Sequence, residues 1–155
     1  MSSTTNSNQA IAEQQENQNS RSIIEVAQEA FQHFMHGAAT GDWESFINSV
    51  TDDCIFEITL PVEQWLGKQV GKNRVADFFH FERDELDLEL FITLNNVTSN
   101  ENTVGFEFYV EGHVAGNFYK NRIAMFFDVR GDKISGFREY AGAIDPKAVV
   151  RESSN

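Results

Sequence analysis

The chain has 155 residues, of which 41% are hydrophobic and 12% aromatic, with 14 phenylalanines and a formal net charge of -12. This length suits one domain that buries a core without cross-links, and the single cysteine, Cys54, excludes an internal disulfide. The acidic balance and scattered basic residues argue against nucleic acid or a membrane surface as partner, and the apolar stretches are too short to span a bilayer.

Polar residues dominate both ends of the chain. Residues 1–20 are mainly Ser, Thr, Asn, Gln and Glu, and such a segment cannot offset the conformational entropy that ordering costs. We expect a disordered tail over 1–20, one folded domain over 21–148 and a flexible tail over 149–155. The N-terminus lacks the apolar core of a signal peptide, so a cytoplasmic location is expected.

The folded part is predicted to open with helices. Ser22 and Glu25 form a capping box, apolar residues follow at helical spacing, and Gly37 is the expected stop. A second, shorter helix is expected to begin at Asp42 as its N-cap. A short strand over 54–60 follows and ends before a proline.

A third helix and a set of long strands complete the predicted domain. Val75, Phe78 and Phe79 indicate the helix, after which the apolar residues recur with the period of two that is typical of strands. The expected long strands cover 86–95, 104–111, 118–129 and 133–143. A turn at 130–132 joins the last two, and helices followed by hairpin-linked strands indicate an α+β fold with a curved antiparallel sheet around an apolar hollow. Both faces of the third long strand are largely apolar, so the sequence does not decide which of them points inward.

Three groups of motifs follow one another in chain order. They are Ala39-Thr40-Gly41-Asp42-Trp43 followed by Phe46, Gly67-Lys68-Gln69-Val70-Gly71 followed by Val75, and Tyr119-Lys120-Asn121-Arg122 with Arg138-Glu139-Tyr140. Together they resemble the nuclear-transport-factor-2-like superfamily, in its ketosteroid-isomerase-like and SnoaL-like polyketide cyclase branch and, more loosely, its phenazine-biosynthesis proteins. The resemblance covers about residues 22–147 and implies a cone-shaped α+β barrel that pairs as a homodimer through the outer sheet face. This fold hosts isomerases, cyclases, epoxide hydrolases, dehydratases and non-catalytic binders.

Glu139 is the first catalytic candidate. The resemblance to phenazine proteins implies a cavity-facing glutamate in acid–base chemistry, and its strand-face neighbours Phe137 and Ala141 are apolar. Desolvation would then raise its pKa toward neutrality, unless it is a structural carboxylate held by Asn121. Asn121 and Tyr119 share a face of the adjacent strand, where they either orient a substrate oxygen or only satisfy buried polar groups.

Two histidines and several aromatic residues are further candidates. His80 ends the third helix, where it either pairs with a pocket carboxylate or packs at the helix end. His113 shares a strand face with Glu111 and is a substrate-binding candidate. The candidate walls for a flat or polycyclic ligand are Trp43, Phe56, Trp65, Phe106 and Phe137, with ordinary core packing as the alternative.

Other acidic residues are interpreted as non-catalytic. The stretch that contains Glu82, Asp84, Glu85, Asp87 and Glu89 alternates in part with leucines and indicates a solvated face. The resemblance to isomerases leads us to expect an aspartate on the first strand, but the chain has Ile58 there, after Glu57.

The sequence has no glycine-rich phosphate loop, nucleophile elbow or zinc-ligand spacing, so we expect neither a nucleotide nor a metal. The leading hypothesis is a cofactor-free cyclase or isomerase that acts on a small apolar carbonyl compound, with Glu139 moving the proton. The alternative is a non-catalytic module that binds a hydrophobic or aromatic ligand, or a protein partner, with the same cone.

Overall fold

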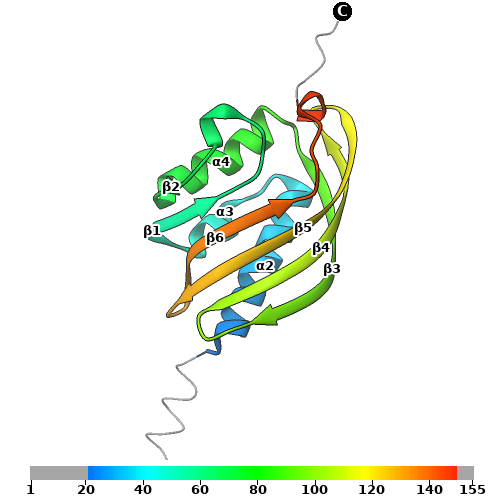
Figure 1. The fold of residues 1–155 in the computed structure, drawn as a ribbon. Helices are drawn as coiled ribbons and strands as arrows, with labels where there is room; N and C mark the ends of the chain where they lie inside the picture. The colour runs from blue at the N-terminus through cyan, green and yellow to red at the C-terminus, as the bar shows by residue number, and fades with distance from the viewer. Residues whose placement is uncertain (1–20, 150–155) are drawn as a thin grey trace, which may run out of the picture.

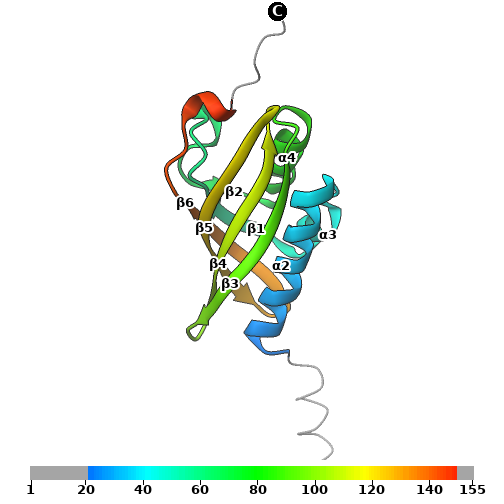
Figure 2. The ribbon, with the colours of Figure 1, turned by 90° about the vertical axis from the view of Figure 1, so that its right-hand side faces the viewer.

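A strongly bent sheet and three helices form the described part of the chain. The computed structural model describes residues 21–149, and the tails expected over 1–20 and 150–155 lie outside the described residues. The elements in chain order are α2 (Ile23–Thr40), α3 (Glu44–Asn48), β1 (Val50–Glu57), η1 (Glu63–Trp65), β2 (Gln69–Val70), α4 (Lys72–Asp84), β3 (Glu89–Ser99), β4 (Thr103–Val114), β5 (Asn117–Arg130), β6 (Lys133–Ala141) and η2 (Pro146–Val149). Figure 1 shows the bend of the sheet, and Figure 2 shows the helices gathered on one side of it. This is the α+β fold expected from the sequence.

The six strands lie in the order β2-β1-β6-β5-β4-β3. All neighbouring pairs are antiparallel except β1 and β6, which run parallel with Phe56 opposite Phe137. The predicted hairpin between the last two long strands is confirmed, with Gly131 in its turn at a φ of 64°. Glycine adopts this left-handed conformation without the strain that a side chain would add.

The faces of β5 are distinguished by burial. Ile123, Met125 and Phe127 are buried on the inner face, whereas Ala124 and Phe126 are only partly buried on the outer face. β6 alternates in the same way: buried Phe137 points inward and Arg138 points outward. The inner face therefore carries the odd-numbered residues of β5 up to Phe127 and of β6 from Phe137 onward. Before Phe137 the register shifts, and even-numbered Ile134 is the buried residue.

The first helix begins as expected but ends later. The Ser22 hydroxyl accepts a hydrogen bond from the Glu25 backbone N–H (3.2 Å), which confirms the predicted N-cap. The predicted stop at Gly37 is wrong, because α2 continues to Thr40 and ends at Gly41, whose φ is 80°. Gly37 is buried inside the helix, where the absence of a side chain leaves room for the ring of Trp43.

The second helix and first strand also differ from the predicted bounds. Asp42 still caps the turn, since its Oδ1 accepts from the Glu44 N–H (3.3 Å), although the helix itself begins only at Glu44. β1 begins four residues earlier than expected and ends at Glu57, opposite Arg138. Beyond that pair, the Thr59 side chain accepts the hydrogen bond of the Ala141 N–H (3.0 Å), and the backbone ladder stops.

Phenylalanine rings fill the space between the helices and the inner sheet face. Phe31 of α2 stacks on Phe106 of β4 with ring centroids 4.3 Å apart, and Phe56 stacks on Phe137 at 5.0 Å. Each of these four side chains is at most 2% exposed. In residues 21–149, no helix is both long and apolar enough to cross a membrane.

Candidate functional site

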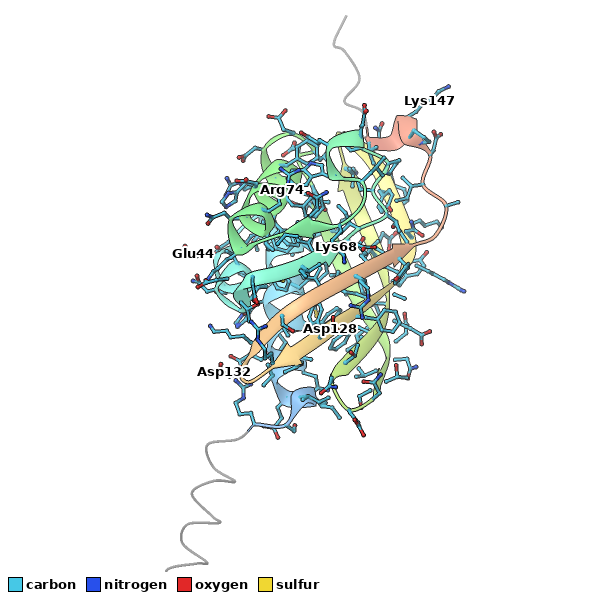
Figure 3. The ribbon with its side chains drawn as sticks, turned by 60° about the vertical axis from the view of Figure 1, so that its left-hand side comes forward. Glu44, Lys68, Arg74, Asp128, Asp132 and Lys147 are labelled. Carbon is cyan, nitrogen blue, oxygen red and sulfur yellow. The ribbon has the colours of Figure 1, made fainter. Side chains whose placement is uncertain are left out.

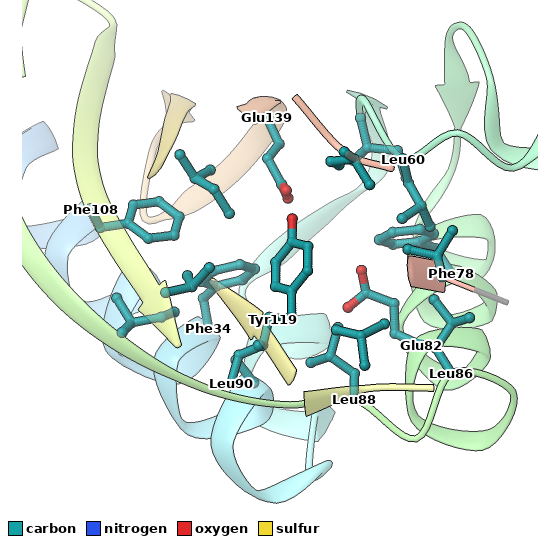
Figure 4. Close-up of a pocket in the computed structure, with 18 of the residues that line it drawn as sticks. Phe34, Leu60, Phe78, Glu82, Leu86, Leu88, Leu90, Phe108, Tyr119 and Glu139 are labelled. Carbon is teal, nitrogen blue, oxygen red and sulfur yellow. The ribbon is translucent and has the colours of Figure 1, made fainter. Parts of the chain in front are cut away.

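A cavity of about 50 Å³ lies between α2, α4 and the inner face of β3–β6. Its lining is mostly apolar and includes Phe34, Trp43, Phe78, Phe108, Leu88 and Leu90. Val149, predicted to belong to a flexible tail, is instead 6% exposed in η2 and helps to close the cavity. Figure 4 shows the polar side chains of Glu82, Tyr119 and Glu139 among these apolar walls.

Glu139 reaches the cavity from β6. The strand alternation that buries Phe137 also directs Glu139 inward, while Arg138 between them faces outward and pairs with Asp128 at 2.6 Å. Glu139 as a whole is half-buried, and desolvation of its carboxyl raises the pKa from 4.5 to about 7. The carboxyl therefore gains and loses its proton near neutral pH.

Glu82 is a second carboxyl group in the cavity, and the sequence interpretation missed it. Our assignment of Glu82 to a solvated acidic face is wrong, because the residue lies on α4 and lines the cavity. Its pKa is raised well above 4.5 by burial and also by the negative charge of Glu139. The spacing of Val75, Phe78 and Glu82 places all three on one helix face, and this period would have revealed the position.

Tyr119 is positioned by Asn121, its neighbour on the same face of β5. The Asn121 Nδ2 donates to the Tyr119 hydroxyl oxygen (2.9 Å) and to the Gly142 carbonyl (3.2 Å). Figure 4 shows the Tyr119 hydroxyl pointing toward Glu139. Burial raises the pKa of Tyr119, which keeps the phenol protonated and able to donate. Asn121 is not among the lining residues, and no hydrogen bond joins it to Glu139 in the described chain.

Neither histidine candidate lies in the cavity. Phe78 and Phe79 occupy the buried face of α4, so that the next residue, His80, is exposed. His113 is also exposed, because Val114 takes the inward position beside it on β4. The centroids of the His113 and Phe118 rings are 6.0 Å apart. The expectation that these histidines contribute to the pocket is therefore corrected.

Of the five aromatic candidates, only Trp43 lines the cavity. Phe56, Phe106 and Phe137 are packed in the core, where they stack on other rings instead of leaving a gap. Trp65 packs against Phe78 and lies beneath the Arg74 guanidinium, 3.8 Å from the ring centroid (Figure 3 shows Arg74). The cavity is accordingly much smaller than one that would hold a polycyclic ligand.

Arg130, Asp53 and Cys54 lie outside the cavity. Arg130 pairs with Asp53 at 2.6 Å and holds the pKa of that carboxyl at about 2. The thiol of Cys54 is buried, which raises its pKa to about 12 and makes it a poor nucleophile. Within residues 21–149, no group of three or more His, Cys, Asp or Glu side chains is arranged to hold a metal ion.

A bent sheet that encloses a cavity against three helices is the architecture of nuclear-transport-factor-2-like proteins. The model of the SnoaL-like domain family matches residues 31–137, and the chain belongs to this family. A comparison with the curated proteins finds no match.

Solved structures support the same fold. An NTF2-like protein from Anabaena variabilis ATCC 29413 is 43% identical over 78% of this chain and 90% of its own, with a TM-score of 0.72. A protein from Jannaschia sp. CCS1, provisionally described as a SnoaL-like polyketide cyclase, is 12% identical over 75% of this chain and 85% of its own, with a TM-score of 0.61. An LEH-like epoxide hydrolase from M. tuberculosis is 14% identical over 76% of this chain and 83% of its own, also with a TM-score of 0.61. For the two structures that are 12% and 14% identical, the likeness concerns the fold alone.

Proposed function

We propose that the chain is an acid–base enzyme of the isomerase or cyclase type that acts on a small carbonyl compound. The observation that carries this proposal is the position of the Glu139 carboxyl, inside an apolar cavity and facing the Tyr119 hydroxyl. A carboxyl whose pKa is about 7 exchanges its proton at neutral pH with little free-energy cost in either direction.

The roles follow from the donors and acceptors present. Glu139 takes a proton from the carbon beside the substrate carbonyl and returns it at another position. Tyr119 donates its hydroxyl hydrogen to the oxygen on which negative charge develops, since Asn121 already occupies the acceptor side of that hydroxyl. The apolar walls exclude water, and this strengthens both interactions.

The size of the cavity limits the substrate. A buried water needs about 10–15 Å³ of such volume, so 50 Å³ corresponds to roughly three to five non-hydrogen atoms. A small ketone or aldehyde fits these walls without movement of the chain.

Deuterium exchange tests the proposal even when the product is unidentified. The chain is incubated in D₂O with a panel of small ketones and aldehydes, and NMR follows exchange at the carbon next to the carbonyl. For at least one compound, wild-type protein is expected to accelerate exchange, and Glu139→Gln to slow it by about 10²-fold or more. Glu89→Gln, which alters an exposed carboxylate of β3, serves as the matched control.

The alternative function gives a different result in the same assay. If no compound exchanges faster with wild-type protein than with Glu139→Gln, the proton-transfer role is wrong. The cavity would then belong to a binding module.

A further inference from the structure

The cavity contains acidic groups but no basic side chain. Its titratable lining groups are Glu82 from α4, Tyr119 from β5 and Glu139 from β6, and none of the described lining residues is Lys, Arg or His. The nearest cation along β6, Arg138, points to the outer face and is already paired with Asp128. Two carboxyl groups therefore share an apolar space with no resident counter-ion.

Aromatic rings line the same cavity as these carboxyl groups. They are Phe34, Trp43, Phe78 and Phe108, and the negative face of an aromatic ring attracts a cation. A cation that is desolvated among such rings is attracted more strongly than one in water. Carboxylates and aromatic faces together are the groups that recognise organic ammonium ions.

We propose that the ligand of this cavity is a small organic amine, bound as the ammonium cation between Glu82, Glu139 and the aromatic rings. An ammonium group supplies the missing positive charge, whereas an anionic ligand meets two acidic groups and is rejected. This inference rests on the proposed function, because it assigns the amine to the cavity in which Glu139 moves the proton. It narrows the substrate class to amino ketones and amino aldehydes. In this arrangement Glu82 anchors the ammonium group, and Glu139 remains the proton carrier.

Binding of the amine is coupled to release of a proton. An ammonium ion that meets a protonated carboxyl group forms an ion pair with the carboxylate, and the carboxyl proton passes to the solvent. The affinity for the amine therefore rises as the pH rises through the range in which Glu139 and Glu82 lose their protons. It falls again near pH 10, where an aliphatic amine itself becomes neutral.

Three probes of the same size, with five non-hydrogen atoms each, test the charge preference. Isobutylamine, isobutanol and propionate are titrated into the full chain by calorimetry at pH 7, in two buffers with different ionisation enthalpies. We expect isobutylamine to bind at least about tenfold more tightly than isobutanol, with release of about one proton, and propionate to show no binding. Equal or tighter binding of isobutanol, or preferred binding of propionate, overturns the proposal.

Variants then locate the anchor. Glu82→Gln is expected to lower the affinity for isobutylamine at least about tenfold and to leave isobutanol binding within twofold. Glu85→Gln changes an exposed carboxylate beside the same helix end and is expected to alter neither. Glu82→Asp keeps the charge and should retain the preference for the amine, which provides a second test if Glu82→Gln does not fold.

The two proposals fail separately. If neutral ketones exchange deuterium in a Glu139-dependent manner but isobutylamine does not bind preferentially, only the amine inference is overturned. If isobutylamine binds as expected and Glu139→Gln exchanges deuterium at the wild-type rate, only the proton-transfer function is overturned.

Discussion

The indole ring of Trp43 lies directly against the backbone of Gly37, so that a Cβ on residue 37 would lie 2.2 Å from Cε3 of the ring. This contact seats Trp43 against α2 at 2% exposure and within 4.3 Å of the Phe79 ring centroid. Trp43 in turn forms part of the cavity wall. The close approach explains a glycine in the interior of a helix, where its conformational freedom is otherwise a cost.

Gly37→Ala is expected to lower the free energy of unfolding by about 2 kcal/mol, although alanine favours the helix. The added methyl group displaces the indole ring, and overpacking of this kind costs more than the gain in helix propensity. Urea denaturation measures the change. Gln32→Ala, at an exposed position of the same helix, should stay within about 0.5 kcal/mol of wild type, and equal stability of the two variants would contradict the packing argument.

Stability is expected to fall as the pH rises from about 4.5 to 7. The folded chain binds the Glu139 proton more tightly than the unfolded chain does, so its contribution is fully present below pH 4.5 and is lost as the pH passes about 7. The loss is on the order of 3 kcal/mol for Glu139, and Glu82 adds to it in the same direction. The pKa values of Asp53 and Asp128 are lowered in the folded chain. These two groups therefore reduce the stability only when the pH falls below about 4.

Glu139→Gln provides the control for that pH dependence. The amide has no proton to lose, so the variant should be more stable than wild type at pH 8 and close to it at pH 4.5. Chemical denaturation at both pH values tests this. If the free energy of unfolding changed equally with pH in the two proteins, the Glu139 carboxyl would have an ordinary pKa.

Asn121→Leu is expected to raise the pKa of Tyr119 further. The hydrogen bond from Asn121 to the phenol oxygen stabilises the phenolate, and leucine keeps the volume without the donor. The ¹³Cζ resonance of Tyr119, assigned with the help of Tyr119→Phe, reports the titration. A lower Tyr119 pKa in the leucine variant would rule out the described hydrogen bond.

Phe106→Leu and Phe108→Leu are expected to have different effects, although both residues point inward from β4. Phe106 stacks on Phe31 in the core, so its loss should cost about 1 kcal/mol of stability and leave isobutylamine binding within twofold. Phe108 lines the cavity, and its replacement should weaken that binding by more than threefold. Calorimetry and urea denaturation on the two variants separate core from cavity wall, and equal binding losses would contradict the assignment.

The outer sheet face is expected to pair with a second copy of the chain. It carries an open groove of about 630 Å³ beside Tyr140, which is 52% exposed, and Phe91 of β3 is 59% exposed. Exposed aromatic residues on a polar face are typical of protein interfaces. Sedimentation equilibrium at micromolar concentration should give a dimer, which Tyr140→Glu dissociates and Leu66→Glu, off the sheet, does not. A monomeric wild-type chain would exclude this interface.

Local patterns were sufficient for most of the fold. The cap at Ser22, the turn around Gly131 and the alternation along β4 each depend on neighbouring residues, and the sequence predicted them. The inward direction of Glu139 also follows from alternation, once the facing of buried Phe137 is known.

Contacts between distant segments account for what the sequence did not reveal. Gly37 resembles a helix stop until Trp43 is placed against it, and the parallel pairing of β1 depends on a strand at the other end of the domain. Glu82 resembles a surface acid because the residues after it are charged, and only the period of α4 shows that its side chain enters the cavity. His80 shows the reverse error, since its chemistry suggested a site that its position on α4 excludes.

The place of β6 between β1 and β5 has a consequence for how the chain folds. β1 is made early but gains its parallel neighbour only when β6 is available, and the bond that closes this seam joins Thr59 to Ala141, 82 residues later. Pairings of such high contact order form slowly. A nascent chain that ends before β6 therefore has an unpaired edge on β1. Such an edge is a site of aggregation that a chaperone would need to cover. Glu139, which lies on β6, reaches its place only in the last stage of sheet assembly.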